Sequence, residues 1–351
     1  MKKSTAIVMA IILCLSLVAG CSSPSTNNSV PATNGSSAPA SSAPGAATNP
    51  TDVSIAVVSP IGTPLATAGP VMEEKLNTSG LFKAAFYPEA QLGSVVDLLD
   101  RCLADDPIVL FCDPVEFADI TVPEIGALSA PFLITSFEQY DKLYASNWWK
   151  DIEAKVAEKG LTIIAKNAVM GDRHILTKKP VVSLADLKGM KIRVPPTVAY
   201  IAGFTALGAN PTPMAVTEIY TSLQQGVIDG LEHPYPDIVS RKNYEVAKNV
   251  VVQPHIKQIF VAVCGKGFFD SLTPEQQQLI ISANMESFEY NNTLVAELND
   301  AAEAEMRASG VTFNDINIEE FAAAAKGFFE YPDMAEWSPG LYDELMSIIN
   351  G

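Results

Sequence analysis

The chain has 351 residues, 48% of them hydrophobic, and a formal net charge of −17 at pH 7. This length suits two domains or one large one, and the acidic balance argues against a nucleic acid or an anionic lipid surface as partner. The three histidines lack metal-ligand spacing, and the common nucleophile-elbow, zinc-protease, phosphate-loop and dinucleotide motifs are missing. We therefore expect no metal and no cofactor, and an enzyme is disfavoured without being excluded.

Residues 1–20 form the first predicted element, a signal peptide. Lys2 and Lys3 precede an uncharged apolar run of fourteen residues, Ala6–Ala19, whereas a membrane-spanning helix needs about 20. The run ends at Val18-Ala19-Gly20-Cys21, which is similar to the lipobox of bacterial lipoproteins. The resemblance implies cleavage before Cys21 and lipidation of its thiol, and two acyl chains would anchor the protein stably. An ordinary signal followed by an incidental cysteine is the alternative.

Residues 21–51 are predicted to form a disordered linker that begins at the lipidated cysteine. The segment from Ser22 to Pro50 holds no charged and no aromatic residue. Such a segment cannot bury enough apolar surface to offset the entropy lost on ordering. We expect a flexible tether between the membrane and the folded part of the chain.

Strands and helices then alternate. Strands are expected over residues 53–58, 82–87 and 108–112, with helices up to about residue 76 and over 91–103. Further along, strands are expected over 161–169, 174–177, 190–194 and 228–231, a short helix after the capping pair Ser183 and Asp186, and helices over 197–207 and 218–225. The alternation predicts an open α/β sheet with helices on both faces.

A long helix is predicted from Thr273 onward. Thr273 suits the N-cap position, Pro274 the first turn and Gln276 the third position, and neither Gly nor Pro follows before Ser309. A helix of up to about 35 residues would be about 50 Å long, which exceeds one small domain. It would therefore span two lobes, and a chain that crosses between lobes more than once favours a hinged clamshell.

The run from Gly171 to Pro234 contains a series of informative segments: Gly171-Asp-Arg-His174, Lys179-Pro-Val181, Asp186-Leu-Lys-Gly-Met-Lys-Ile-Arg-Val-Pro195, Leu207-Gly-Ala-Asn-Pro-Thr-Pro-Met214 and Glu218 through Pro234, with Tyr87-Pro-Glu-Ala-Gln-Leu-Gly93 and Ala130-Pro-Phe-Leu133 upstream. Together they extend over most of residues 52–310. In this order and at these spacings they resemble the solute-binding subunit of TRAP transporters (tripartite ATP-independent periplasmic transporters), the DctP-type dicarboxylate-binding family.

This resemblance implies a type II-like, periplasmic-binding-protein-like clamshell. Lobe 1 would hold residues 52–170 and about 259–298, and lobe 2 residues 171–258 and about 299–351. The protein would be exported and lipid-anchored on the outer face of the cytoplasmic membrane. It would capture a small carboxylate-bearing solute, such as a C4-dicarboxylate or a sugar acid, in the interlobe cleft and deliver it to the membrane permease subunits. A receptor that feeds a sensor, and an exported enzyme acting on organic acids, are the competing hypotheses.

Two arginines are the main predicted ligand contacts. Arg193 lies at the carboxyl end of a strand, where open α/β sheets place ligands, and its planar fork of donors matches a carboxylate. The family's arginine in Ile-Arg-Val grips the substrate carboxylate, and the resemblance implies that role here. Arg173 matches a second family arginine. The alternative for Arg193 is a surface ion pair, and for Arg173 it is a salt bridge to Asp172 or Asp186.

Four further positions complete the predicted site. His233 stands where many family members have Asn, and an imidazole can donate and accept hydrogen bonds. Val216 stands where relatives that bind larger acids often place an aromatic residue, although a plain core valine is equally consistent. Asp113 and Gln91 follow the ends of first-lobe strands, and Asp113 could accept from ligand hydroxyls or could cap a turn. His255 is interpreted as structural.

The remaining cysteines leave one question open. If Cys14 leaves with the signal and Cys21 carries lipid, then Cys102, Cys112 and Cys264 remain, and an odd number cannot all pair. A Cys102–Cys112 disulfide is one option, and packing as small hydrophobic residues is the other. The identity of the acid and the oligomeric state do not follow from the residues.

Overall fold

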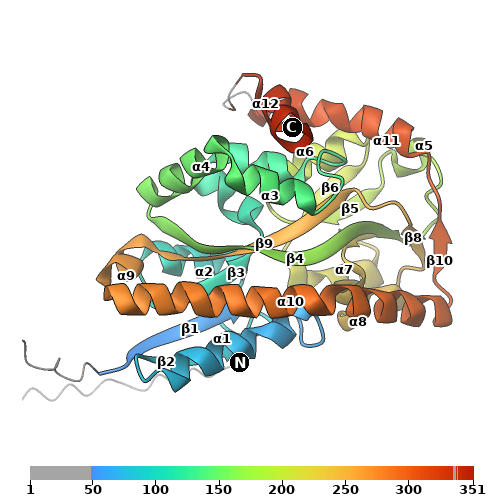
Figure 1. Cartoon of the computed structure of the whole chain (residues 1–351). Coiled ribbons are helices and arrows are strands. Elements are labelled where there is room, and N and C mark those ends of the chain that lie inside the picture. The colour runs from blue at the N-terminus through green and yellow to red at the C-terminus, as the bar shows by residue number, and fades with distance from the viewer. Residues whose placement is uncertain (1–48, 335–336, 338) are drawn as a thin grey trace, which may run out of the picture. The chain divides into compact units, whose positions relative to one another are not determined.

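The computed structural model describes residues 49–334, 337 and 339–351, which belong to one compact unit (Figure 1). The expected signal peptide, Cys21 and nearly all of the expected linker lie outside the described residues. None of the helices in the described part of the chain is long and apolar enough to cross a membrane.

The strands of the described residues form one mixed sheet in the order β2-β1-β3-β9-β4-β7-β5-β6, and β8 extends it by pairing with β4 and with β10. β1, β2 and β3 run parallel, β9 and β4 are antiparallel at the centre, and β5 runs parallel to β6 and β7. The strands are β1 (Thr51–Val57), β2 (Phe82–Tyr87), β3 (Ile108–Cys112), β4 (Leu161–Thr177), β5 (Lys191–Val194), β6 (Asn210–Pro213), β7 (Gly230–His233), β8 (Asn249–Val251), β9 (Ile256–Gly265) and β10 (Thr312–Asn314).

Helices cover both faces of this sheet, as the alternating pattern predicts (Figure 1). The α-helices are α1 (Pro64–Thr78), α2 (Val95–Leu103), α3 (Glu138–Ala145), α4 (Asn147–Glu158), α5 (Leu184–Leu187), α6 (Val198–Ala206), α7 (Ile219–Gln225), α8 (Tyr235–Ser240), α9 (Lys266–Ser271), α10 (Pro274–Ala308), α11 (Ile318–Ala325) and α12 (Leu341–Asn350). The 3₁₀ helices include η1 (Pro114–Ile120), η2 (Pro123–Ser129), η3 (Val216–Glu218), η4 (Asn243–Glu245), η5 (Lys326–Glu330) and η6 (Pro332–Met334).

The two strands expected over 161–169 and 174–177 are wrong as separate elements, because β4 is a single strand of 17 residues. It pairs with β9 as far as Arg173 and then with β7 from His174 onward. Register shifts interrupt the pairing with β9, one of them next to Gly171, whose φ is 114°. A bulge that contains a residue with positive φ bends the strand and changes the direction of the side chains that follow. One strand thus carries the sheet from its first half into its second.

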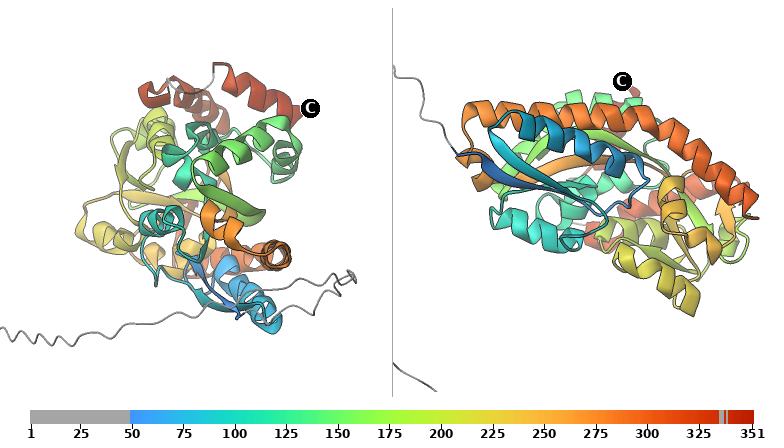
Figure 2. Two further views of the ribbon diagram at one scale, coloured as in Figure 1. Left: turned by 90° about the vertical axis from the view of Figure 1, so that its left-hand side faces the viewer. Right: turned by 90° about the horizontal axis from the view of Figure 1, so that it is seen from below.

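The predicted long helix is confirmed. α10 has 35 residues, and Thr273 and Gln276 form the reciprocal capping bonds at its start. It contacts α1, β4 and α8, so it runs along both halves of the sheet (Figures 1 and 2). The Ser183–Asp186 capping pair is also confirmed, and α7 ends before Gly226, whose φ is 76°.

Two local differences bear on the site. The helix expected from residue 91 begins at Val95, because Glu89 and Ala90 both have a φ of 57° and Ser94 then caps the helix through Asp97. The segment after β3 forms η1 and η2, which the sequence pattern does not predict. Both 3₁₀ helices start at a proline.

The three cysteines of the described residues, Cys102, Cys112 and Cys264, are buried and free. The Cys102–Cys112 disulfide considered from sequence is therefore absent, and the thiols pack among the apolar side chains of the core. Burial raises their pKa values, which fits a packing role for them.

Candidate functional site

A cavity of about 310 Å³ opens between residues of the first and second halves of the sheet. Five of the six predicted ligand contacts line it: Asp113, Arg173, Arg193, Val216 and His233. Gln91 does not line it. The tight turn in which the Gln91 amide donates to the Pro88 carbonyl leaves Gln91 exposed, and its neighbours Ala90 and Gly93 line the cavity instead.

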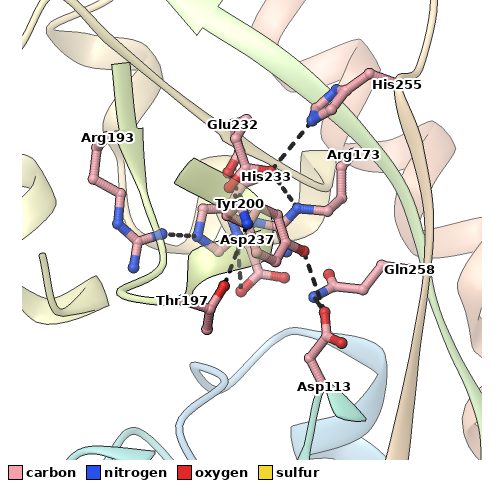
Figure 3. Close-up of polar contacts among 10 residues, drawn as sticks. All are labelled: Asp113, Arg173, Arg193, Thr197, Tyr200, Glu232, His233, Asp237, His255 and Gln258. Carbon is pink, nitrogen blue, oxygen red and sulfur yellow. Dashed lines mark hydrogen bonds and ion pairs between the residues drawn. The ribbon is translucent and has the colours of Figure 1, made fainter. Parts of the chain in front are cut away.

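Arg193 is the third of four residues in β5 and is 3% exposed. Its Nε and Nη2 donate to the Met214 carbonyl oxygen at 3.1 and 2.9 Å, which fixes the plane of the guanidinium. No carboxylate of the described residues forms an ion pair with it. Burial lowers the pKa of Arg193 to about 10; the charges of Glu232 and Glu116 oppose this shift, and those of Arg173 and Arg241 add to it. The cavity wall therefore carries a positively charged guanidinium whose orientation is fixed by Met214 and which has no ion-pair partner among the described residues (Figure 3).

Arg173 on β4 has a carboxylate partner, Glu232 on β7. Its Nε and Nη2 bond the two carboxylate oxygens, the latter at 2.5 Å, and Nη2 also donates to the Glu232 carbonyl at 3.0 Å. Glu232 is fully buried. Burial alone would raise the pKa of Glu232, but the charge of Arg173 and the hydrogen bonds from His255 and Arg173 together outweigh it, and the net pKa shift is downward.

The salt bridges that the sequence offered as alternatives for Arg173 do not form. Asp172 pairs with Lys257 at 2.7 Å, and Asp186 caps α5. His255, interpreted as structural, does not line the cavity, and its Nε2 lies 3.4 Å from Glu232 Oε2. The guanidinium of Arg173 is thus fixed by the buried carboxylate of Glu232, which also contacts His255 (Figure 3).

His233 ends β7 beside Arg193, with its Nε2 3.4 Å from Arg193 Nη1. Because a guanidinium nitrogen can only donate, Nε2 accepts and the ring proton lies on Nδ1. Burial lowers the pKa of His233 strongly, and the neighbouring arginines add to this, so the ring is neutral. Nδ1 has no hydrogen-bond partner and lies 4.0 Å from Asp237 Oδ1. The Nδ1–H group of His233 is therefore left without an acceptor.

Asp113 has one of the two roles considered for it, the cap of a turn, and its other oxygen accepts from protein side chains. Its Oδ1 accepts from the Val115 amide at 3.1 Å and caps η1. Its Oδ2 accepts from Gln258 Nε2 at 2.8 Å and from the Tyr200 hydroxyl at 3.2 Å. Burial raises the pKa of Asp113, although these hydrogen bonds oppose the shift. Val216 likewise lines the cavity and packs against the core.

Several lining residues were missed by the sequence reasoning, above all Glu116, Tyr200, Asp237 and Arg241. Glu116 lies on η1, and its Oε2 is buried without a partner. Burial, reinforced by Asp113, raises the pKa of Glu116 to about 8. Arg241, which follows α8, lies 3.8 Å from Asp237 and donates to the Val58 carbonyl at 2.8 Å. The spacing of three residues between Asp113 and Glu116 is the one signal that points to Glu116, and it requires a helical turn there.

A two-lobed α/β fold with a long helix along both halves and a charged cavity between them defines a class, the extracytoplasmic solute-binding proteins. The family model for bacterial extracellular solute-binding proteins of family 7 matches residues 58–331, and the chain belongs to that family. The predicted relation to TRAP transporter solute-binding subunits is confirmed.

Relatives with stated ligands support the same assignment. A TRAP periplasmic solute-binding protein from Actinobacillus succinogenes, solved with bound L-galactonate, is 34% identical with a TM-score of 0.81, over 86% of this chain and 99% of that one. A counterpart from Fusobacterium nucleatum with bound sn-glycerol-3-phosphate is 27% identical with a TM-score of 0.79, over 86% and 97%. The 2,3-diketo-L-gulonate-binding periplasmic protein YiaO of Escherichia coli is 32% identical over 251 residues, 70% of this chain and 75% of the relative.

Proposed function

We propose that this protein captures a small organic acid, a C4-dicarboxylate or a sugar acid, with the ligand carboxylate on Arg193, and delivers it to the membrane permease subunits of a TRAP transporter. The observation that carries the proposal is the guanidinium of Arg193. It is buried in the cavity wall, fixed by Met214, and has no carboxylate partner among the described residues.

The cost of burying that charge gives the physical reason. A buried ion without a counter-ion is unfavourable, and an anionic ligand would supply the missing partner with a geometry that fits the planar fork. Water expelled by the ligand would lower the local dielectric and strengthen the contact. A ligand that binds the closed arrangement better than an open one would shift the population towards closure.

The relatives favour a carboxylate without deciding the acid. L-galactonate and diketogulonate are acids, and the Fusobacterium nucleatum protein binds a phosphate ester. A guanidinium accepts both kinds of anion. A carboxylate is favoured on Arg193 because it brings one negative charge to the one unpaired guanidinium, whereas a phosphate group brings up to two into a cavity that Asp113 also lines.

The location of the protein and the movement of its lobes are proposed from the role of the family and from the sequence. Lipid on Cys21 would hold the protein at the outer face of the cytoplasmic membrane, with residues 22–51 as the tether. Residues 52–170 and about 259–298 would move as one lobe against 171–258 and about 299–351, about a hinge near Arg173, where β4 exchanges β9 for β7. Release of the ligand unchanged, as shown by mass spectrometry of the recovered solute, would support a binding role without turnover.

A thermal-shift screen of the purified full-length chain tests the ligand class. The screen should contain aldonates, uronates, C4-dicarboxylates and sn-glycerol-3-phosphate. A true ligand at about 100 times its Kd adds about 2.7 kcal/mol to the free energy of unfolding. Stabilisation by phosphate esters alone would contradict the proposal.

Substitution of Arg193 then tests the contact itself by calorimetric titration. Arg193→Ala should weaken binding of the best acid by about 2–5 kcal/mol, because a buried charge pair loses one partner. Arg193→Lys should recover part of that loss, since it keeps the charge and loses the fork. Arg101→Ala, which removes an exposed ion pair with Asp106, is the control and should leave the affinity unchanged. An unchanged affinity in Arg193→Ala would remove the basis of the proposal.

A further inference from the structure

Not every arginine that lines the cavity has a carboxyl partner. Three arginines line it, and two of them have carboxyl partners: Arg173 has Glu232, and Arg241 lies 3.8 Å from Asp237. Arg193 alone lacks one among the described residues. A single free guanidinium binds a single carboxylate, so the cavity supplies one anchor for anionic charge rather than two.

The other charged groups that line the cavity are all carboxyls, namely Asp113, Glu116 and Asp237. In a cavity of about 310 Å³, a ligand whose first carboxylate lies on Arg193 cannot keep a second carboxylate far from them. Like charges close together in a water-poor site repel strongly. Arg173 and Arg241 already face carboxyl partners, so a second carboxylate of the ligand would find no free guanidinium and would lie near Asp113 and Asp237.

The same environment has unused hydrogen-bonding capacity for neutral groups. Glu116 Oε2 is buried and has no partner, and His233 Nδ1, on a side chain 10% exposed, has none either. A hydroxyl group can donate to the first and accept from the second. A ligand without hydroxyls would leave both atoms unsatisfied after water is expelled, which a polar site penalises.

Glu116 differs from the other two acids in this respect. Both oxygens of Asp113 already accept hydrogen bonds, from Val115, Gln258 and Tyr200. Asp237 faces Arg241 and His233. Glu116 has no ion-pair partner among the described residues, and one oxygen of its carboxyl group remains free.

Building on the function proposed above, we propose that the cavity selects a polyhydroxylated monocarboxylate over a dicarboxylate, and that Glu116 is the residue that sets this preference. Its carboxyl group, with one oxygen free of any protein partner, binds a ligand hydroxyl in the cavity that Arg193 also lines. Raised by burial and by Asp113, the pKa of Glu116 lets it hold a proton near neutral pH, in which state it can donate to a hydroxyl as well as accept from one.

Four matched six-carbon acids separate the two contributions in calorimetric titrations of the full-length chain. Galactonate has one carboxylate and hydroxyls, galactarate has two carboxylates and hydroxyls, hexanoate has one carboxylate alone, and adipate has two carboxylates alone. Gluconate and glucarate repeat the hydroxylated pair with another stereochemistry. We expect the aldonate to bind at least about tenfold more tightly than the aldarate of the same series, and at least about a hundredfold more tightly than hexanoate.

The Glu116→Gln variant tests the residue. The titrations are made at about pH 9, above the pKa of about 8 of Glu116, where the amide keeps the shape and an acceptor oxygen and removes a negative charge. The ratio of aldonate to aldarate affinity should then fall several-fold. Glu297→Gln, an identical substitution on the exposed face of α10, should leave the ratio unchanged. If Glu116→Gln does not fold, the ratio measured on the unsubstituted chain still decides the selectivity.

The outcomes distinguish this inference from the function on which it rests. An aldarate that binds as tightly as its aldonate, or a ratio that Glu116→Gln does not change, would overturn the inference and leave acid capture standing. Failure of every acid to bind would overturn both.

Discussion

The two walls of the cavity carry opposite chemistry and are built differently. The arginine wall, consisting of Arg173, Arg193, His233 and Arg241, lies on β4, β5, β7 and the end of α8. The acidic wall, consisting of Asp113 and Glu116, lies on η1 just after β3. Strand ladders position three members of the arginine wall, whereas side-chain hydrogen bonds from Tyr200 and Gln258 hold the acidic wall. The proposed anchor for charge is thus placed mainly by regular strands, and the proposed selecting group, Glu116, by an irregular turn.

The largest expected effect is on the arginine wall, through Glu232→Ala. This change leaves the guanidinium of Arg173 buried without its counter-ion, and His255 without its neighbour. Removal of one partner of a buried pair costs about 3–5 kcal/mol, so the free energy of unfolding in urea should fall by about that amount.

The matched control for Glu232→Ala is Glu303→Ala. It breaks an exposed pair with Arg307 on α10 and should cost only about 0.3–0.5 kcal/mol. Equal losses in the two variants would mean that the Arg173–Glu232 pair does not stabilise the arginine wall. The difference between the walls would then have another cause.

The two walls also differ in how well the sequence predicts them, because one is built mainly on strands and the other on an irregular turn. Arg173, Arg193 and His233 lie within one run of segments that resembles the family, and this resemblance is what points to all three. Only Arg193 also falls in a strand that the apolar pattern predicts, because Arg173 lies between the strands expected over 161–169 and 174–177, and His233 lies beyond the strand expected over 228–231. Glu232 stands in the quoted Glu-His-Pro segment, but its role as partner of Arg173 depends on the pairing of β4 with β7, in which His174 faces His233. That register is not visible in a single sequence.

The acidic wall is predicted only in part. Asp113 follows an unmistakable buried strand, but Glu116 reaches the cavity because residues 114–120 form a 3₁₀ helix, which no apolar period announces. Gln91 fails for a related reason, since the consecutive left-handed residues Glu89 and Ala90 redirect the chain before α2. In general terms, regular elements of this fold follow from pattern, and the irregular turns that complete its site do not.

The second prediction concerns the acidic wall without ligand. Burial raises the pKa of Glu116 to about 8 from 4.5, so the native state keeps a proton that the unfolded chain has released. Native stability therefore declines as pH rises from about 4.5 to about 8 through this group. Glu116→Gln does not titrate, and its Tm should exceed that of the unsubstituted chain by several degrees at about pH 8 and by little at about pH 5.

Thermal denaturation of both chains across this pH range makes the measurement. Glu297→Gln on α10 serves as the surface control. A Tm difference that shrinks as pH rises would have the wrong sign. It would show that the free carboxyl of the acidic wall is stabilised as an anion.

The smallest expected effect concerns the hydrogen bond from Tyr200 to the acidic wall. Tyr200 on α6 is buried, and its hydroxyl donates to Asp113 Oδ2, which also accepts from Gln258. Tyr200→Phe removes one of two donors to that oxygen, so the free energy of unfolding should fall by about 1 kcal/mol. Tyr220→Phe breaks an exposed bond to Glu245 at 3.1 Å and should cost less, since water replaces the lost donor. A loss of about 3 kcal/mol in Tyr200→Phe would mean that Gln258 cannot hold Asp113 alone, and the acidic wall would then depend on α6, an element of the second half of the sheet, for its position.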